Sequence, residues 1–421
     1  MRGVDHASSF HVHLLMKLRF RRHLRAAACL LVLFVAGADA RASDAPAPAS
    51  IEAAVKDLCG RKVVLLGEDA NHGSGQTLAL KSALVQRLIT DCGFEAVFFE
   101  SQIYDFLDLD RAFVERTARP EQLADAMGGL WSASAEIQAL TAFLFDAASQ
   151  GRVRLAGLDP QVGGATQRYT QQRLAARLAS VLDEAGRETC ESAFFQHFNW
   201  RYDDASPFDA AAQATLKRCA GNVATRAAAL PATPDNRVTA VMASNLVEYL
   251  GVSEASEPIA GFDRRDRAMH QNFAWHVARL PRDARIIVWC ASVHAAKTLH
   301  GVHDAWTPLG EWVHRAYGRR AAAVAFSAWS GSFGRPGKPP VTLPIAETGS
   351  LEAGAIGAST ADSIYLDHRA LRALSSKPAR ALDYRKSQSP DWARLFDAII
   401  VLREERSSRA VAVTGARQPP P

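Results

Sequence analysis

The sequence predicts an α/β protein, with a mostly parallel central sheet flanked by helices and a large helical insertion. Three observations lead to this prediction. Short apolar runs alternate with longer segments of helical periodicity, an order typical of α/β proteins. The span from about residue 166 to 269 has helical periodicity and no strong strand candidate. The chain has 421 residues and is 48% hydrophobic, so it can bury a large core.

The amino-terminal segment, residues 1–42, is predicted to be an export signal, with Met16 as an alternative start. A cationic stretch precedes an apolar run at residues 26–38, and small residues follow at the expected cleavage site, residues 40–42. That run is shorter than the roughly 20 residues that span a bilayer, so no stable membrane anchor is expected. Residues 43–51 are predicted to be a linker, and the expected location is periplasmic or secreted.

The net charge of the chain argues against nucleic acid as a partner. The formal charge is +5, but beyond residue 42 the chain has 42 basic and 42 acidic residues. A neutral mature chain has no polyanion-binding surplus, so no nucleic-acid partner is expected.

One domain is predicted over residues 52–405, followed by a flexible tail at residues 406–421. Its strands are expected from six apolar runs, at residues 62–67, 95–99, 153–158, 285–290, 322–327 and 398–402. Leucines at helical spacing over residues 78–89 place a helix between the first two runs. The helical insertion is expected to contain helices at residues 171–185, 209–228 and 236–250, and residues 331–340 are predicted to be a surface loop.

Five cysteines lie beyond the signal, in a compartment where disulfides persist. Cys59 stands four residues before Val63 and Cys92 four before Ala96, at the start of the first two apolar runs, and adjacent parallel strands would bring them to the same sheet edge. We therefore predict a Cys59–Cys92 disulfide. Cys190 and Cys219 are expected to pair within the helical region, leaving Cys290 free, and the alternative is that all five are reduced.

Candidate catalytic residues stand where the predicted strands end. Glu68, Glu100 and Asp159 end the first three strands, and His294 follows the fourth. His72 lies in the turn after the first strand, before a helix whose N–H groups are open to an anion. Parallel strands present their carboxyl ends at one edge, where α/β sheets bind ligands, so these side chains are expected to share a site.

The residue types point to hydrolysis by activated water. The sequence has neither a nucleophile-elbow motif nor a phosphate-binding glycine loop, which disfavours serine hydrolases and nucleotide-binding proteins. A histidine flanked by carboxylates can take a proton from water while the acids stabilise the imidazolium. His294 or Lys81 would then stabilise the oxyanion or protonate the leaving alcohol. The pair Arg265-Asp266 opens the helix before the fourth strand and could point the arginine into the crevice, with a surface ion pair as the alternative.

Two alternatives use the same residue types. Two histidines and two carboxylates also suit a divalent metal, which would make the protein a metal-dependent hydrolase or peptidase. A non-catalytic protein that binds haem or another small ligand is the second alternative. The leading interpretation requires no cofactor, and no metal ligands are assigned.

Several motifs together resemble the erythromycin esterase family, which includes succinoglycan-biosynthesis-like proteins. They are VVLLGEDANHG, LKSALVQRL, GFEAVFFES, VRLAGLDPQ, RDRAMHQNFAW, IIVWCASVH and FDAIIVLREE, and they extend over roughly residues 52–405. The resemblance implies an α/β domain of that type and hydrolysis of an ester or lactone by water that a histidine activates, with no metal required.

Residue by residue, the resemblance makes His72 the general base and Glu100 the carboxylate of the second strand. Either Glu68 or Asp69 takes the place of the family's first carboxylate, because the turn here is one residue longer. Lys81 replaces the usual arginine, and Ala291 replaces the first of two histidines. These departures argue against macrolides as the substrate more than against hydrolysis.

The sequence thus predicts an exported hydrolase of a small carboxylic ester or lactone. The expected catalytic residues are His72, Glu68, Glu100 and His294. The expected substrate-binding residues are Asp69, Lys81, Asp159 and Arg265. The identity of the substrate and the oligomeric state are left open.

Overall fold

The computed structural model describes residues 48–411, apart from residues 165, 254–256, 358 and 375. The predicted signal at residues 1–42 and the tail beyond residue 411 lie outside the described residues. Helix α1 (Ala49–Leu58) begins inside the predicted linker, because Ile51 is already buried in the core. Residues 406–411 are also ordered against the fold: the backbone N–H of Ser408 donates to Gly73 and Gly334. The predicted linker and tail are therefore shorter than expected.

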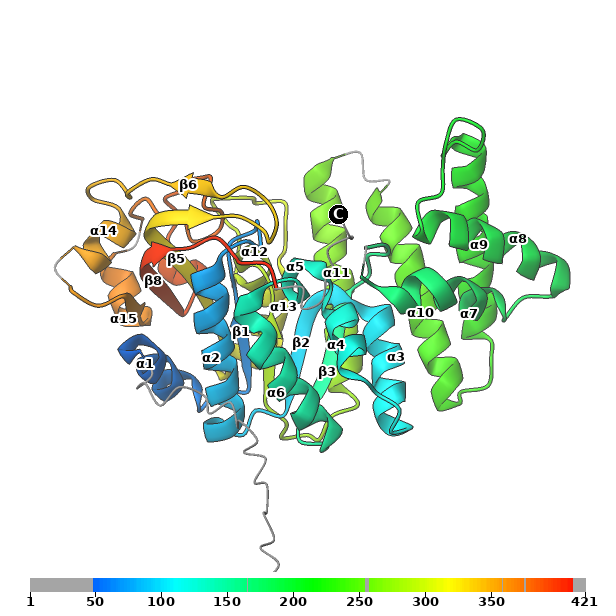
Figure 1. The fold of residues 1–421 in the computed structure, drawn as a ribbon, viewed down its shortest axis with the longest axis horizontal. Helices are drawn as coiled ribbons and strands as arrows, with labels where there is room; N and C mark the ends of the chain where they lie inside the picture. The colour runs from blue at the N-terminus through cyan, green and yellow to red at the C-terminus, as the bar shows by residue number, and fades with distance from the viewer. Residues whose placement is uncertain (1–47, 165, 254–256, 358, 375, 412–421) are drawn as a thin grey trace, which may run out of the picture. The chain divides into compact units, whose positions relative to one another are not determined.

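A mostly parallel sheet forms the centre of the described chain, as predicted (Figure 1). Its main path runs β3-β2-β4-β1-β5-β8-β7, with β6 paired to β5. Only β6 and β7 run antiparallel to their neighbours. The strands are β1 (Val63–Leu66), β2 (Ala96–Gln102), β3 (Arg154–Asp159), β4 (Ile286–Trp289), β5 (Ala321–Phe333), β6 (Val341–Leu343), β7 (Ser363–Leu366) and β8 (Ala398–Glu405).

Alternate residues of each central strand face two different helical layers, because side chains alternate across a strand. Val64 and Leu66 of β1 join the core beneath α1, α2 (Gly75–Cys92) and α6 (Gln138–Ser149). Val63 and Leu65 join the core beneath α11 (Pro258–Val277) and α13 (Leu309–Tyr317). The two layers lie on opposite faces of the sheet in Figure 1.

Short elements connect these layers on both sides of the sheet. After β2 come α3 (Ile103–Val114), α4 (Pro120–Met127), α5 (Gly129–Ser132) and the 3₁₀ turn η1 (Ala135–Ile137). After β4 come α12 (Ser292–Ala295) and, beyond α13, η3 (Gly318–Arg320). The last part of the chain adds α14 (Leu351–Ile356), α15 (His368–Ala373) and α16 (Trp392–Leu395).

Between β3 and α11 the described chain is helical, and its helices share a core with α3. The π-helix η2 (Thr170–Leu174) continues into α7 (Ala175–Ala179), and then come α8 (Glu184–Phe198), α9 (Ala210–Ala228) and α10 (Pro234–Ser253). The predicted helix at residues 171–185 is wrong in its second half, because the side chain of Asp183 accepts from Gly186 and caps the start of α8.

The segment at residues 331–340 is also not entirely a loop. Strand β5 extends to Phe333, and residues 331–333 pair with β6, so the connection shrinks to residues 334–340. Among the described residues, no helix is both long and apolar enough to cross a membrane.

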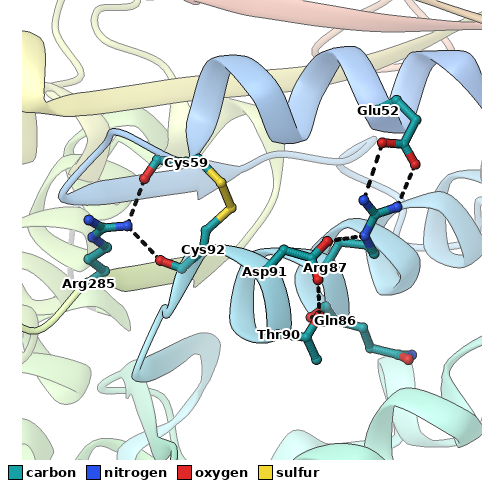
Figure 2. Close-up of a disulfide and its surroundings, with 8 residues drawn as sticks. All are labelled: Glu52, Cys59, Gln86, Arg87, Thr90, Asp91, Cys92 and Arg285. Atoms are coloured by element: carbon teal, nitrogen blue, oxygen red, sulfur yellow. Dashed lines mark hydrogen bonds and ion pairs between the residues drawn. A yellow bond between two sulfur atoms is a disulfide. The ribbon is translucent and has the colours of Figure 1, made fainter.

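Both predicted disulfides are present, and Cys290 is the free cysteine of the described residues. The reasoning for the first was wrong, however, because β4 lies between β1 and β2. Cys59 and Cys92 meet because they end α1 and α2, and both of their carbonyls accept from Arg285 at the start of β4, as Figure 2 shows. The second disulfide joins α8 to α9.

Candidate active site

The carboxyl edge of the sheet holds two clusters of charged side chains. The first is centred on Glu68, directly after β1. Its Oε1 atom accepts from His72 Nδ1 (2.8 Å) and from the indole N–H of Trp131 (2.6 Å), and its Oε2 atom accepts from Lys81 Nζ (2.9 Å). Three donors therefore hold one buried carboxylate, which in turn orients the imidazole of His72.

Electrostatics keep this carboxylate charged although it is buried. Burial alone would raise the pKa of Glu68, but Lys81, His72 and Trp131 lower it. Lys81 is fully buried, and its ammonium also donates to the Cys290 carbonyl (3.1 Å) and lies 4.1 Å from the ring centre of Trp289. Lys81 therefore lies beneath Glu68, where it positions the carboxylate and does not face a substrate.

His72 lies on a strained turn that three segments hold. Its φ is 54°, in the left-handed region that non-glycine residues rarely adopt. The carbonyl of the next residue, Gly73, accepts from the N–H groups of Gly334 (2.9 Å) and Ser408 (3.1 Å). A Cβ on Gly73 would lie 2.5 Å from the backbone of Gly334, so only glycine permits this packing.

The tautomer of His72 follows from its partner. Because Glu68 can only accept, Nδ1 of His72 carries a proton and Nε2 has a free lone pair when the ring is neutral. No side chain or backbone group of the described chain is hydrogen-bonded to Nε2. The imidazole edge thus offers a proton acceptor next to the sheet edge.

The second cluster is built around Arg265 of α11. Its guanidinium donates to both oxygens of Asp159 (2.6–3.2 Å) and to Glu100 Oε1 (2.8 Å). The remaining oxygen of Glu100 accepts from the N–H of Ala291 (2.7 Å). Burial alone would raise the pKa of Glu100, but His294, Arg265 and His72 hold it well below its usual range.

His294 completes this cluster as a cation. Its Nδ1 atom donates to Asp266 (2.9 Å), and its Nε2 atom lies 3.1 Å from Glu100 Oε1. Burial would lower the pKa of His294, but Asp266 and Glu100 raise it to about 10. Arg265 Nη1 lies 2.9 Å from His294 Nε2, and since both groups are then donors, they share the Glu100 carboxylate and do not bond to each other.

The end of β4 connects the two clusters. Lys81 binds the carbonyl of Cys290, Glu100 binds the N–H of Ala291, and the N–H of Ser292 donates to the Glu68 carbonyl (2.7 Å). A Cβ on Gly67 would lie 2.6 Å from Ser292, so a glycine there allows β1 and β4 to approach closely. These contacts, together with the electrostatic effect of His72 on Glu100, place both clusters at one site.

Asp69 does not join either cluster. Its carboxylate accepts from the backbone N–H and side-chain amide of Asn71 (both 3.0 Å) and from the N–H of Tyr384 (2.8 Å). Glu68, not Asp69, therefore contacts the histidine of the turn. The carboxylate of Glu405 occupies the expected anion site at the start of α2. It accepts from the N–H groups of Gln76 (2.8 Å) and Thr77 (3.2 Å).

The sequence analysis did not assign three residues that the structure places in the site: Asp266, Trp131 and Trp306. Asp266 is fully buried and accepts from His294, from the indole of Trp306 (2.6 Å) and from the N–H of Leu309 (2.8 Å). Its position next to Arg265 was a usable signal, because adjacent charged residues of a helix can serve one site. The tryptophans carried no polar signal in the sequence.

Two cationic side chains lie where a metal ion would bind the carboxylates of the site. Lys81 and Arg265 lie among the carboxylates Glu68, Glu100 and Asp159, where a bound cation would otherwise be. Within the described ranges, no group of three or more His, Cys, Asp or Glu side chains is arranged to hold a metal ion. The carboxylates of the site thus already have fixed cationic partners.

Comparison with known proteins gives a family match and structural neighbours. A family model described as Erythromycin esterase matches residues 89–405, a range that includes Glu100, Asp159, Arg265 and His294 and begins after His72. No curated protein matches significantly. A Bacillus cereus protein of known structure superposes with a TM-score of 0.64 at 15% identity, covering 86% of this chain and 93% of that one.

Two further solved structures show the same fold. A succinoglycan biosynthesis protein has a TM-score of 0.64 at 15% identity, over 85% of this chain and 91% of its own. A mutant of the erythromycin esterase EreC, in its open conformation, has a TM-score of 0.60 at 17% identity, over 86% of this chain and 95% of its own.

Proposed function

Because this chain belongs to the erythromycin esterase family, we propose that it hydrolyses a carboxylic ester or lactone with water activated by His72. The family supports a hydrolase that acts on ester bonds of a small molecule. The histidine-activated water, the substrate and the export of the protein are parts of the proposal.

The observation that carries the proposal is the Glu68–His72 pair at 2.8 Å. Glu68 holds the imidazole by Nδ1 and leaves Nε2 as the acceptor, which is the arrangement a general base requires. The same carboxylate would stabilise the imidazolium after proton transfer. Trp131 and Lys81 fix the carboxylate, so the base is held in one orientation before substrate binds.

The second cluster supplies positive charge for the reaction. In the proposed first step, the water oxygen bonds to the carbonyl carbon, its proton moves to His72 Nε2, and the carbonyl oxygen becomes an oxyanion. Arg265 and protonated His294 stabilise that negative charge. The oxyanion then collapses, the bond to the leaving oxygen breaks, and the proton on His72 passes to that oxygen.

The two disulfides support the part of the proposal that concerns export. Two disulfides are consistent with an extracellular protein, since disulfides persist in oxidising compartments. We infer that the folded part is periplasmic or secreted. Expression with periplasmic fractionation tests this, and recovery of the full chain only in the cytoplasm with reduced cysteines would contradict it.

The function is tested with a panel of esters and lactones that includes erythromycin. His72→Asn should lower kcat by about 100- to 10,000-fold, which is the usual loss when a general base is removed. The measurement is kcat and KM on every ester that the wild type cleaves. His300→Asn is the matched control, because His300 is largely exposed and pairs only with Asp304.

Two results would contradict the proposal. Full activity of His72→Asn would exclude His72 as the base, and no turnover of any ester by the folded wild type would exclude the reaction class. A chelator in the assay, combined with elemental analysis of the purified protein, tests the metal-dependent alternative: activity that persists with far less than one metal per chain removes it.

A further inference from the structure

A groove opens beside the turn that carries His72. It has a volume of about 380 Å³ and lies between that turn, the β5–β6 connection and the segment after Tyr384. Its main lining residues are Asn71, Phe333, Arg335, Lys338, Val341 and Arg385.

Direct contacts join the groove to the catalytic turn. Arg335 Nε donates to the carbonyl of Asn71 (2.8 Å), the residue before His72. The side chain of Asn71 donates to Asp383 (3.2 Å), which leads to Arg385 on the opposite wall. A molecule in the groove would therefore lie beside Asn71, one residue before the proposed base.

The groove is cationic, and its three charged side chains lack acidic partners among the described residues. Arg335, Lys338 and Arg385 line it, and no acidic residue does. None of the three forms an ion pair with a carboxylate of the described chain. The acid nearest in sequence, Asp383, accepts instead from Asn71 and from the backbone N–H of Arg385 (2.9 Å). Elsewhere on the surface, many arginines do pair with neighbouring carboxylates, as Arg87 does with Glu52.

The floor of the groove is apolar. Phe333 is only 2% exposed, and the Arg385 guanidinium lies 5.8 Å from its ring centre. Val341, at 43% exposure, forms part of the rim. Phe333, Val341 and Arg385 also line a neighbouring cavity of about 570 Å³, whose lining includes Glu347 and Glu352, so the groove without acidic residues ends at these three side chains.

We propose that this groove binds a carboxylate group of the ester substrate, so that the enzyme prefers anionic esters. The inference rests on the proposed function and adds the substrate class. Cations without acidic partners, over an apolar floor, complement an organic anion whose charge lies among Arg335, Lys338 and Arg385 and whose carbon chain contacts Phe333. The ester carbonyl then extends past Asn71 toward His72.

The test compares three nitrophenyl esters whose acyl chains have equal length and end in a carboxylate, a methyl ester or a trimethylammonium group. The wild type should have the lowest KM for the carboxylate, and added salt should reduce that preference. The double variant K338Q/R385Q, which leaves the Arg335 contact with the His72 turn in place, should raise KM for the anionic ester by about tenfold, with kcat and the neutral ester nearly unchanged. Arg218→Gln, an exposed arginine on α9, is the matched control.

A binding measurement separates this inference from the proposed function. Glutarate is titrated into the full chain by calorimetry, for the wild type and for K338Q/R385Q, with glutaramide as the neutral control. If esters are cleaved without preference for charge and glutarate does not bind, the subsite is excluded while the hydrolase proposal stands. If no ester is cleaved but glutarate binding depends on Lys338 and Arg385, the anion site stands without the reaction.

Discussion

At the scale of single residues, Asp266 determines the charge of His294. It is fully buried, bonds to Nδ1 of His294 and is itself held by Trp306 and by the N–H of Leu309. Its negative charge and that of Glu100 overcome the burial that would otherwise lower the pKa of His294. The imidazolium proposed to stabilise the oxyanion thus depends on a residue that does not face the substrate.

We predict that Asp266→Asn lowers the pKa of His294 from about 10 toward its ordinary value of 6.5. The expected loss of unfolding free energy is about 3 kcal/mol at pH 7, because a buried ion pair loses one partner. NMR titration of His294 measures the pKa directly. Asp263→Asn, one turn earlier on α11, is the control, since Asp263 binds Arg267 and Thr307 and not His294.

The raised pKa also predicts how stability changes with pH. Between pH 6.5 and about 10 the folded state holds a proton on His294 that the unfolded state has released, so the His294 contribution to stability falls as pH rises through this range. The stability difference between wild type and Asp266→Asn should therefore shrink toward pH 10. Urea unfolding across the range checks this, and a constant difference would contradict the assigned charge.

The sequence identified many of the residues that the structure brings together, because polar residues directly after apolar strands are a local signal. Glu68, His72, Glu100, Asp159 and His294 all lie at the carboxyl edge, and Arg265 reaches it. The partners within each cluster could not be predicted. Side-chain direction depends on tertiary packing, which is why Asp69 was grouped with the site although it binds Tyr384.

At the scale of elements, the Cys59–Cys92 disulfide fastens the end of α1 to the end of α2 (Figure 2). Arg285 connects the same two ends to β4 through the carbonyls of both cysteines. Farther along the two helices, Arg87 of α2 contacts Glu52 of α1 and Asp91 of its own helix. The disulfide is the strongest of these links, since exposed ion pairs contribute little.

We predict that C59A/C92A lowers the unfolding free energy by about 3–4 kcal/mol. Without the crosslink, the unfolded chain regains the conformational entropy that closing a loop of this length removes. The sequence separation is 33 residues. Chemical denaturation monitored by tryptophan fluorescence measures the change. Cys290→Ala serves as the control, because Cys290 is a free buried thiol, and an equal loss in both variants would contradict a specific role for the crosslink.

The strand order shows the limit of sequence-based reasoning at this scale. Six apolar runs correctly predicted six strands, but β6 and β7 were missed. Residues 341 and 342 of β6 are exposed and the middle of β7 is only half-buried, so neither strand has a continuous apolar pattern. Which strands pair is a long-range property, and the insertion of β4 between β1 and β2 has no local signal.

At the scale of the whole molecule, the helices after β3 pack around a core that they share with α3. Leu178, Phe194, Leu216 and Leu246 pack together there, apart from the cores on the two faces of the sheet. The Cys190–Cys219 disulfide crosslinks two of these helices. Because this core is separate from those of the sheet, the helices around it can unfold locally while the sheet stays folded.

We therefore predict that C190A/C219A speeds amide exchange in α8 and α9 and leaves β1, β2 and β4 almost unchanged. Hydrogen exchange read by mass spectrometry resolves the two regions. The C59A/C92A variant is the reciprocal control, since it should affect α1 and α2 first. Uniformly faster exchange over the sheet in C190A/C219A would show that the described chain unfolds as one unit.

The Gly73 carbonyl has a consequence for biosynthesis. It is held by Gly334 and Ser408, which the ribosome adds more than 250 residues after Gly73 itself. The growing polypeptide can form β1 and α2 long before then, but the bend that presents the imidazole cannot be locked until residue 408 has been added. A product truncated before Ser408 would thus carry the histidine without the contacts that hold its turn.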